Sequence, residues 1–174
     1  LTDINATSAH WDFVRDAPEY GVRPVVGIDF RNASTDRDPA GTPLYIGYAR
    51  NNAGYANLCA HLNTHLHVHR PFEPVAPALD HTFIVYPWSR WKQARHPLRP
   101  NEYIGVRPWE QAELRLLEGA ADVPHDQLIA LHTFTFRHKR DWNCHRILRA
   151  VDRNELLSKL PEVATGHPYD RLLS

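Results

Sequence analysis

The stretch RPVVGIDF, from Arg23 to Phe30, decides the fold class of this chain. Its short, continuous run of apolar and β-branched residues is typical of a strand buried in a parallel sheet. Asp29 falls at the carboxyl end of this predicted strand. The turn-rich, polar sequence from Arg31 to Pro43 predicts a loop. Further strands are predicted at Leu44 to Ala49, His81 to Pro87, Asn101 to Val106 and Asp126 to Phe134.

Helical patterns alternate with these strands. The predicted helices are Ser8 to Tyr20, a helix capped by Asn51 or Asn52, a helix that begins at Pro108, and Asp141 to Val151. Gly21 and Gly119 stand where the first and third of them can end. The basic and aromatic segment from Trp88 to Pro100 has only weak helical character. The alternation predicts an α/β domain on a parallel sheet, open or closed into a barrel, with chemistry at the carboxyl ends of the strands.

Composition and charge narrow the class of protein. The 174 residues contain 43% hydrophobic residues, enough for one globular core, and the formal net charge is zero. A neutral chain has no global field that attracts nucleic acid or an anionic membrane, so any DNA contact must be local. No apolar run approaches the roughly twenty residues of a membrane span. Cys59 and Cys144, expected as buried thiols, are too few for a disulfide framework, which favours a cytoplasmic location.

Four motifs in order carry a resemblance to a known family: LTDINATSAHWDF, YGVRPVVGIDFRN, ARNNAGYANLCAHL and KRDWNCHRILRAVDRNELLSKLP. Together they resemble the PHP (polymerase and histidinol phosphatase) domain of the bacterial DNA polymerase III alpha subunit, in the shortened form of Bacteroidetes-type polymerases. The resemblance covers essentially the whole chain. It implies a distorted PHP-type barrel of alternating strands and helices that lacks its first strand and helix, over residues 1–160, with 161–174 as a linker toward the polymerase body.

The resemblance also implies a function for the parent chain. The parent would be a DNA-directed DNA polymerase, a nucleotidyltransferase that uses Mg and contacts DNA and replisome subunits. The palm carboxylates would lie beyond Ser174, so this fragment is expected to be inactive, without a cofactor of its own, and to support the polymerase body through packed surfaces. The sequence begins at Leu1 and contains no methionine, as expected of a piece of a longer polypeptide.

Active family members hold divalent ions at the mouth of the barrel, and the matching positions here are degenerate. The usual T-D-H becomes Thr2, Asp3 and Ile4, so an imidazole is replaced by an alkyl group. Asp29 stands where the family has a glutamate. Both ligands of the later D-x-H are replaced by hydroxyls, at Thr133 and Thr135.

We therefore expect no metal at this site, with Asp3, Asp29 and His132 as vestigial candidates. Each of these residues also has a structural interpretation. Asp3 can cap the helix that begins near Ser8, a strand-end aspartate such as Asp29 can likewise cap a helix, and a histidine at a strand end, such as His132, is commonly a hydrogen-bonded structural residue.

The stretch THLHVHR, from Thr64 to Arg70, raises the alternative of a metal site elsewhere. His61 and His65 are four residues apart on the predicted helix, and His67 and His69 follow where the chain runs toward Pro71. We interpret these histidines as solvated side chains at a helix end. The alternative is an active phosphoesterase or 3'-5' exonuclease that binds Zn or Mn through this cluster, Asp3, Asp29 and His132.

Two basic patches remain as candidates for an interface or a DNA contact. Trp88, Arg90, Trp91 and Lys92 mix rings with cations, as single-strand binders and protein interfaces do. The second patch, Arg137, Lys139 and Arg140, can contact phosphates or form a solvated helix face. A nucleic-acid-binding module is therefore a third hypothesis.

Overall fold

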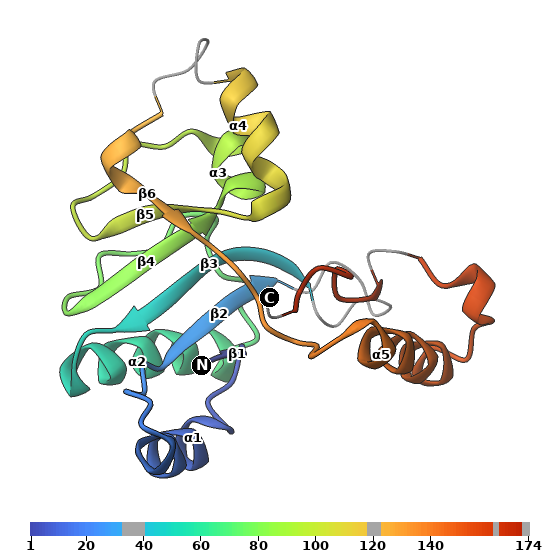
Figure 1. Ribbon diagram of the computed structural model, residues 1–174. Coiled ribbons are helices and arrows are strands. Elements are labelled where there is room, and N and C mark those ends of the chain that lie inside the picture. The colour runs from blue at the N-terminus through green and yellow to red at the C-terminus, as the bar shows by residue number, and fades with distance from the viewer. Residues whose placement is uncertain (33–40, 118–122, 162–163, 172–174) are drawn as a thin grey trace.

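The computed structural model describes residues 1–32, 41–117, 123–161 and 164–171 (Figure 1). The strands within these residues are β1 (Thr2–Ile4), β2 (Gly27–Asn32), β3 (Thr42–Ala49), β4 (Thr82–Pro87), β5 (Glu102–Val106) and β6 (Leu128–Ala130). They form one six-stranded sheet whose spatial order is the order of the strands along the chain. The α-helices are α1 (His10–Asp16), α2 (Asn52–His67), α3 (Trp88–Ala94), α4 (Gln111–Leu117) and α5 (Lys139–Asp152). The chain is an α/β protein.

The sheet is mixed, so the prediction of a parallel sheet is wrong at β3. β3 runs antiparallel to both β2 and β4, whereas β1 pairs with β2, β4 with β5 and β5 with β6 in parallel. A parallel connection needs a crossover of a dozen or more residues, usually a helix, and the sequence between β2 and β3 predicts none. Between β3 and β4 the chain runs along α2 and then returns to the sheet. The start of β4 lies beside the end of β3, where the Arg50 amide donates to the His81 carbonyl at 3.0 Å.

Several strand boundaries differ from the predictions. The strand predicted at Arg23 to Phe30 begins only at Gly27 and continues to Asn32. The strand predicted at Asp126 to Phe134 is confined to Leu128–Ala130. The residues that follow β6 leave the sheet and run toward α5 (Figure 1).

Local signals fix most helix ends. Asn51 caps α2, because its side chain accepts a hydrogen bond from the Gly54 amide at 3.0 Å. Gly21, at φ 68°, ends the 3₁₀ helix η1 (Ala17–Tyr20) that extends α1. Pro108 begins the 3₁₀ helix η2 (Pro108–Glu110), which leads into α4, while Gly119 lies outside the described residues.

The weak helical character assigned to Trp88 to Pro100 is wrong for its first half, which forms α3. Trp88 and Trp91 are three residues apart, so they share one face of α3, and both are buried. Packing of these two indoles stabilises a helix that its basic residues alone do not indicate.

The core lies between the sheet and the helices α2, α3 and α4. Ile28, Phe30, Ile84 and Ile104 come from the strands, and Leu58 from α2 packs against them with no exposed surface. Gly54 lets α2 approach the chain before β4, because a Cβ at this position would lie 1.9 Å from the His81 carbonyl oxygen. A side chain there would separate helix and strand.

α5 lies to one side of the sheet (Figure 1). It packs against the carboxyl-terminal residues 164–171, since the Trp142 indole donates to the Gly166 carbonyl at 2.9 Å and Arg149 Nε donates to the Ala164 carbonyl at 2.9 Å. A single bridge between Phe136 and Arg171 ties the same segment to the chain that leaves β6. Cys144 on α5 is exposed and Cys59 on α2 is half-buried, so the expectation of two buried thiols is wrong for Cys144 and holds only in part for Cys59.

Candidate functional site

Asp3 lies at the end of β1, beside β2, and acts as a helix cap. Its neighbour Ile4 pairs in register with Asp29. The Asp3 Oδ2 atom accepts a hydrogen bond from the amide of Ala9, at the start of α1, at 2.9 Å. The structural interpretation of Asp3 is therefore confirmed.

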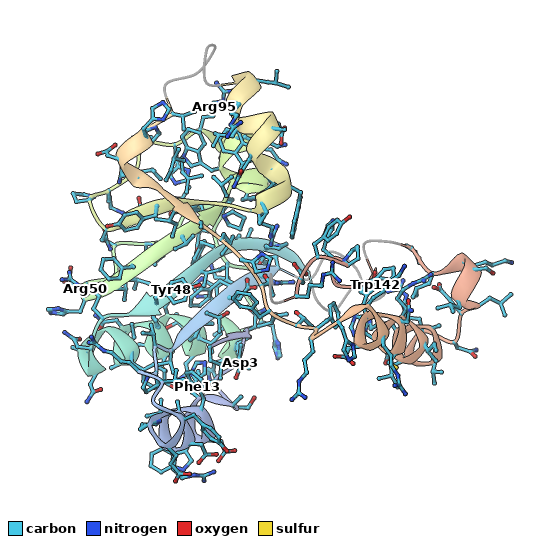
Figure 2. All side chains as sticks on the ribbon, in the orientation of Figure 1. Asp3, Phe13, Tyr48, Arg50, Arg95 and Trp142 are labelled. Carbon is cyan, nitrogen blue, oxygen red and sulfur yellow. The ribbon has the colours of Figure 1, made fainter. Side chains whose placement is uncertain are left out.

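His10 is a site residue that sequence reasoning missed. It is 3% exposed, its Nε2 atom lies 4.0 Å from Asp3 Oδ2, and its Nδ1 atom lies 3.1 Å from the Tyr55 hydroxyl. Burial lowers the pKa of His10, and the nearby Asp3 carboxylate partly offsets that shift. The signal was its place in the first turn of the helix that Asp3 caps. Figure 2 shows Asp3 close to α1, the helix that carries Phe13.

Asp29 is paired with an arginine. Its Oδ2 atom accepts a hydrogen bond from Arg31 at 2.6 Å, and the carboxylate is 8% exposed. The Asn5 side chain holds the Arg31 backbone from both sides, donating to its carbonyl at 2.7 Å and accepting from its amide at 2.9 Å. A guanidinium thus lies against Oδ2 of this carboxylate, while its Oδ1 atom is buried and accepts no hydrogen bond among the described residues. The Oδ2 contact is a salt bridge within one strand.

Tyr48 of β3, labelled in Figure 2, pairs in register with Gly27 of β2, the strand that carries Asp29. Burial raises the pKa of Tyr48, and the Asp29 carboxylate adds to that shift. A phenol that holds its proton is neutral here and brings no charge to the Asp29 and Arg31 pair.

His132 comes from a different part of the sheet than the two aspartates. It follows β6, and β3, β4 and β5 separate that strand from β2. Its Nε2 atom lies 2.8 Å from the Arg171 carbonyl, so it donates there, which confirms the structural interpretation. Thr133 is exposed, and so is Thr135. Across the described ranges, no group of three or more His, Cys, Asp or Glu side chains is placed to hold a metal ion.

The histidines of α2 do not all lie in solvent. His67 and His69 are exposed, but His61 is 9% exposed and His65 is 6% exposed, so the interpretation of solvated side chains is wrong for the latter two. The reason is packing, because both rings lie against Phe72, with centroids 5.6 Å and 4.6 Å from it.

Each buried histidine of α2 has its own hydrogen bonds. The His61 Nε2 atom lies 2.8 Å from the Tyr45 hydroxyl, and burial lowers the pKa of His61. The His65 ring contacts the His61 carbonyl at 3.0 Å and Glu73 Oε2 at 3.0 Å. Both of these partners are acceptors, so each nitrogen of His65 must donate for both bonds to form.

The first basic patch is largely internal. A base or a protein partner can contact only an exposed ring, but Trp88 is 0% exposed and Trp91 is 4% exposed. Lys92 forms an ion pair with Glu113 at 2.5 Å, and Arg90 is half-buried. Rings inside the core cannot stack on bases.

The second basic patch lies on the surface. Arg137, Lys139 and Arg140 are exposed at the start of α5. Next along this helix, the Arg146 guanidinium lies over the Trp142 ring, 4.9 Å from its centroid. This arrangement combines cations with an aromatic ring on one helix.

The comparisons with known proteins add no identity. No protein-family model matches the chain, and no curated protein matches it. Within the described part of the chain, no helix combines the length and the apolar character needed to span a membrane.

Proposed function

We propose that this chain is the PHP-domain portion of a bacterial replicative DNA polymerase III alpha subunit, in which it has a structural role. The order of the four motifs supports this proposal, and so does the α/β fold with an open six-stranded sheet. In the complete parent that sheet would belong to the distorted barrel of the family. The parent would synthesise DNA with Mg, in the cytoplasm, with the rest of the alpha chain as the partner of this domain.

One observation carries the structural role: one oxygen of Asp3 and one oxygen of Asp29 already have structural partners. Asp3 caps α1 through the Ala9 amide, and Asp29 is bound by Arg31. A phosphoesterase needs such carboxylates for metal ions that activate water. In the proposed structural role they stabilise the fold around β1 and β2 instead.

Two experiments test this proposal. The first is to sequence the coding region beyond Ser174, where we expect the acidic motif of a polymerase palm. The second is to measure Zn, Mn and Mg in the purified chain by elemental analysis. The same preparation, with added Mn, is then assayed for phosphate release from p-nitrophenyl phosphate and for nucleotide release from a 3'-labelled oligonucleotide. We expect no stoichiometric metal and no turnover.

The opposite results would replace the structural role by the phosphoesterase or exonuclease. Stoichiometric metal that is lost in Asp29→Asn, together with chelator-sensitive turnover, would be decisive. Glu19→Gln is the matched control. Glu19 is exposed on η1, so this substitution removes the same charge at a position away from Asp3 and Asp29. A coding region without a palm motif would contradict the parentage even if the chain proved inactive.

A further inference from the structure

A cavity opens between α5 and the carboxyl-terminal segment. Its volume is about 600 Å³, within the range of about 300–1,000 Å³ that is usual for ligand sites. Its wall includes Trp142, Arg146, Leu160, Gly166, His167 and Pro168. The Trp142 ring is fixed at one edge by its bond to Gly166, and it carries the Arg146 guanidinium over one face. The cavity is therefore lined by flat, polarisable groups beside a positive charge.

Positive charge is concentrated on α5 and the residues that precede it, although the whole chain is neutral. Residues 137–153 contain six Lys or Arg side chains and two Asp side chains, a formal net charge of +4. Two of the cations are neutralised, since Arg149 pairs with Asp152 at 2.7 Å and Arg153 with Glu155 at 3.4 Å. Among the residues that the structure describes, the side chains of Arg137, Lys139, Arg140 and Arg146 form no ion pair with a carboxylate, although the Arg137 amide donates to Asp141 Oδ2 at 3.1 Å. Four cations remain available for an anion.

We propose that α5 and this cavity bind single-stranded nucleic acid, with one base against the Trp142 and Arg146 pair and the backbone phosphates along Arg137, Lys139 and Arg140. A base has a flat face that stacks on an indole or a guanidinium, and its phosphates need cations that have no other partner. An acidic peptide would use the cations but not the aromatic wall. A duplex keeps its bases stacked inside, where the cavity cannot reach them. This inference rests on the cavity and its charges, and it goes beyond the structural role proposed above.

The test is fluorescence anisotropy of the 174-residue chain with a fluorescein-labelled oligo(dT) ten nucleotides long. We expect Trp142→Ala to weaken binding by about fivefold or more, the loss typical of one stacked base. Phosphate contacts at Arg137, Lys139 and Arg140 predict that affinity falls roughly 20-fold between 50 and 200 mM salt. Lys139→Gln should weaken binding and reduce the slope of log affinity against log salt by about 0.7, whereas Arg146→Gln should weaken binding because a group that stacks on the base is lost.

Matched variants keep the test specific. Arg95→Gln removes one exposed charge at the end of α3, and Figure 2 shows Arg95 and Trp142 in well-separated parts of the molecule. Trp11→Ala removes an indole that is 75% exposed on α1. Both should bind like the unchanged chain. Trp142→Phe keeps a stacking ring, so it should retain most of the affinity. This variant shows that a loss of binding in Trp142→Ala comes from the missing ring and not from unfolding of α5.

Several results would overturn the proposal. One is no binding of oligo(dT) at 50 mM salt by a chain whose circular dichroism spectrum shows that it is folded. A second is equal loss in Arg95→Gln and Arg146→Gln, which would indicate attraction without a site. A third is competition by polyglutamate or a ten-base-pair duplex as strong as that of unlabelled oligo(dT). None of these outcomes depends on whether the chain belongs to a polymerase.

Discussion

Replacing Trp88 by alanine separates a core tryptophan from an interface tryptophan. Trp88 has no exposed surface, its ring stacks on Trp91 with centroids 5.9 Å apart, and its indole donates to Glu113 Oε2 at 3.2 Å. The substitution removes the ring from a closed space between α3, the sheet and α4. If the ring served an external partner, its loss would leave the isolated chain as stable as before.

The expected cost follows from the burial of the ring. Truncation of a buried tryptophan to alanine typically lowers the free energy of unfolding by about 3–5 kcal/mol, because the cavity collapses only in part. The lost hydrogen bond adds little, since the Glu113 side chain is 43% exposed and water replaces the indole. Trp88→Phe keeps a six-membered ring and leaves a smaller cavity, so it should cost less than Trp88→Ala.

The assay is urea unfolding followed by far-ultraviolet circular dichroism at pH 7.5. Trp11→Ala is the control, because Trp11 is 75% exposed, and it should change the free energy of unfolding by no more than about 0.5 kcal/mol. The reasoning is refuted if Trp88→Ala costs no more than Trp11→Ala at an unchanged dependence on urea concentration.

Three other properties are open to measurement. Burial lowers the pKa of four histidines of the folded chain below the ordinary value of 6.5: His10, His61, His96 and His145. The unfolded chain therefore binds more protons than the folded chain near and below pH 6.5. The free energy of unfolding should be at its full value above pH 6.5 and fall as the pH drops below it. A urea midpoint that stays constant from pH 7.5 to 5.5 would contradict this. Gly54→Ala should destabilise by about 1–3 kcal/mol despite the better helix propensity of alanine, because its Cβ would lie 1.9 Å from a backbone oxygen; a higher thermal midpoint would show that α2 can move. Glu102→Ala should cost roughly 3 kcal/mol, because Glu102 is 1% exposed and binds Tyr86 and Arg99 at 2.9 and 2.6 Å; urea unfolding like that of the unchanged chain would count against a buried charge network.

Features with a local cause could be predicted from the sequence. The apolar run before Asp29 marks β2, Asn51 caps α2, and Gly21 ends the first helical segment, because each depends on neighbours within a few residues. The antiparallel direction of β3 relative to β2 could also be predicted, because the sequence between them predicts no crossover helix. The direction of β4 relative to β3 depends on the path of the chain after α2, which no periodicity records.

The same division holds for the candidate site. The helix cap at Asp3 and the hydrogen-bonded role of His132 follow from their places at strand ends. The partner of Asp29 was not predicted, although Arg31 is two residues away, because alternate residues of a strand share a face only if the strand continues past Phe30. Burial of Trp88 and His65 depends on distant residues that cover them, and a pattern of rings and charges does not report that cover.

The order of strands in the sheet bears on how this chain folds during synthesis. Each strand pairs with the strand that precedes it along the chain, from β1 to β6. A ribosome releases the chain from its amino end at about 5–20 residues per second, far more slowly than a helix or hairpin forms. Each new strand therefore finds its partner already outside the ribosome and waits for no later segment. We expect the sheet to assemble progressively on the ribosome, with α5 added last.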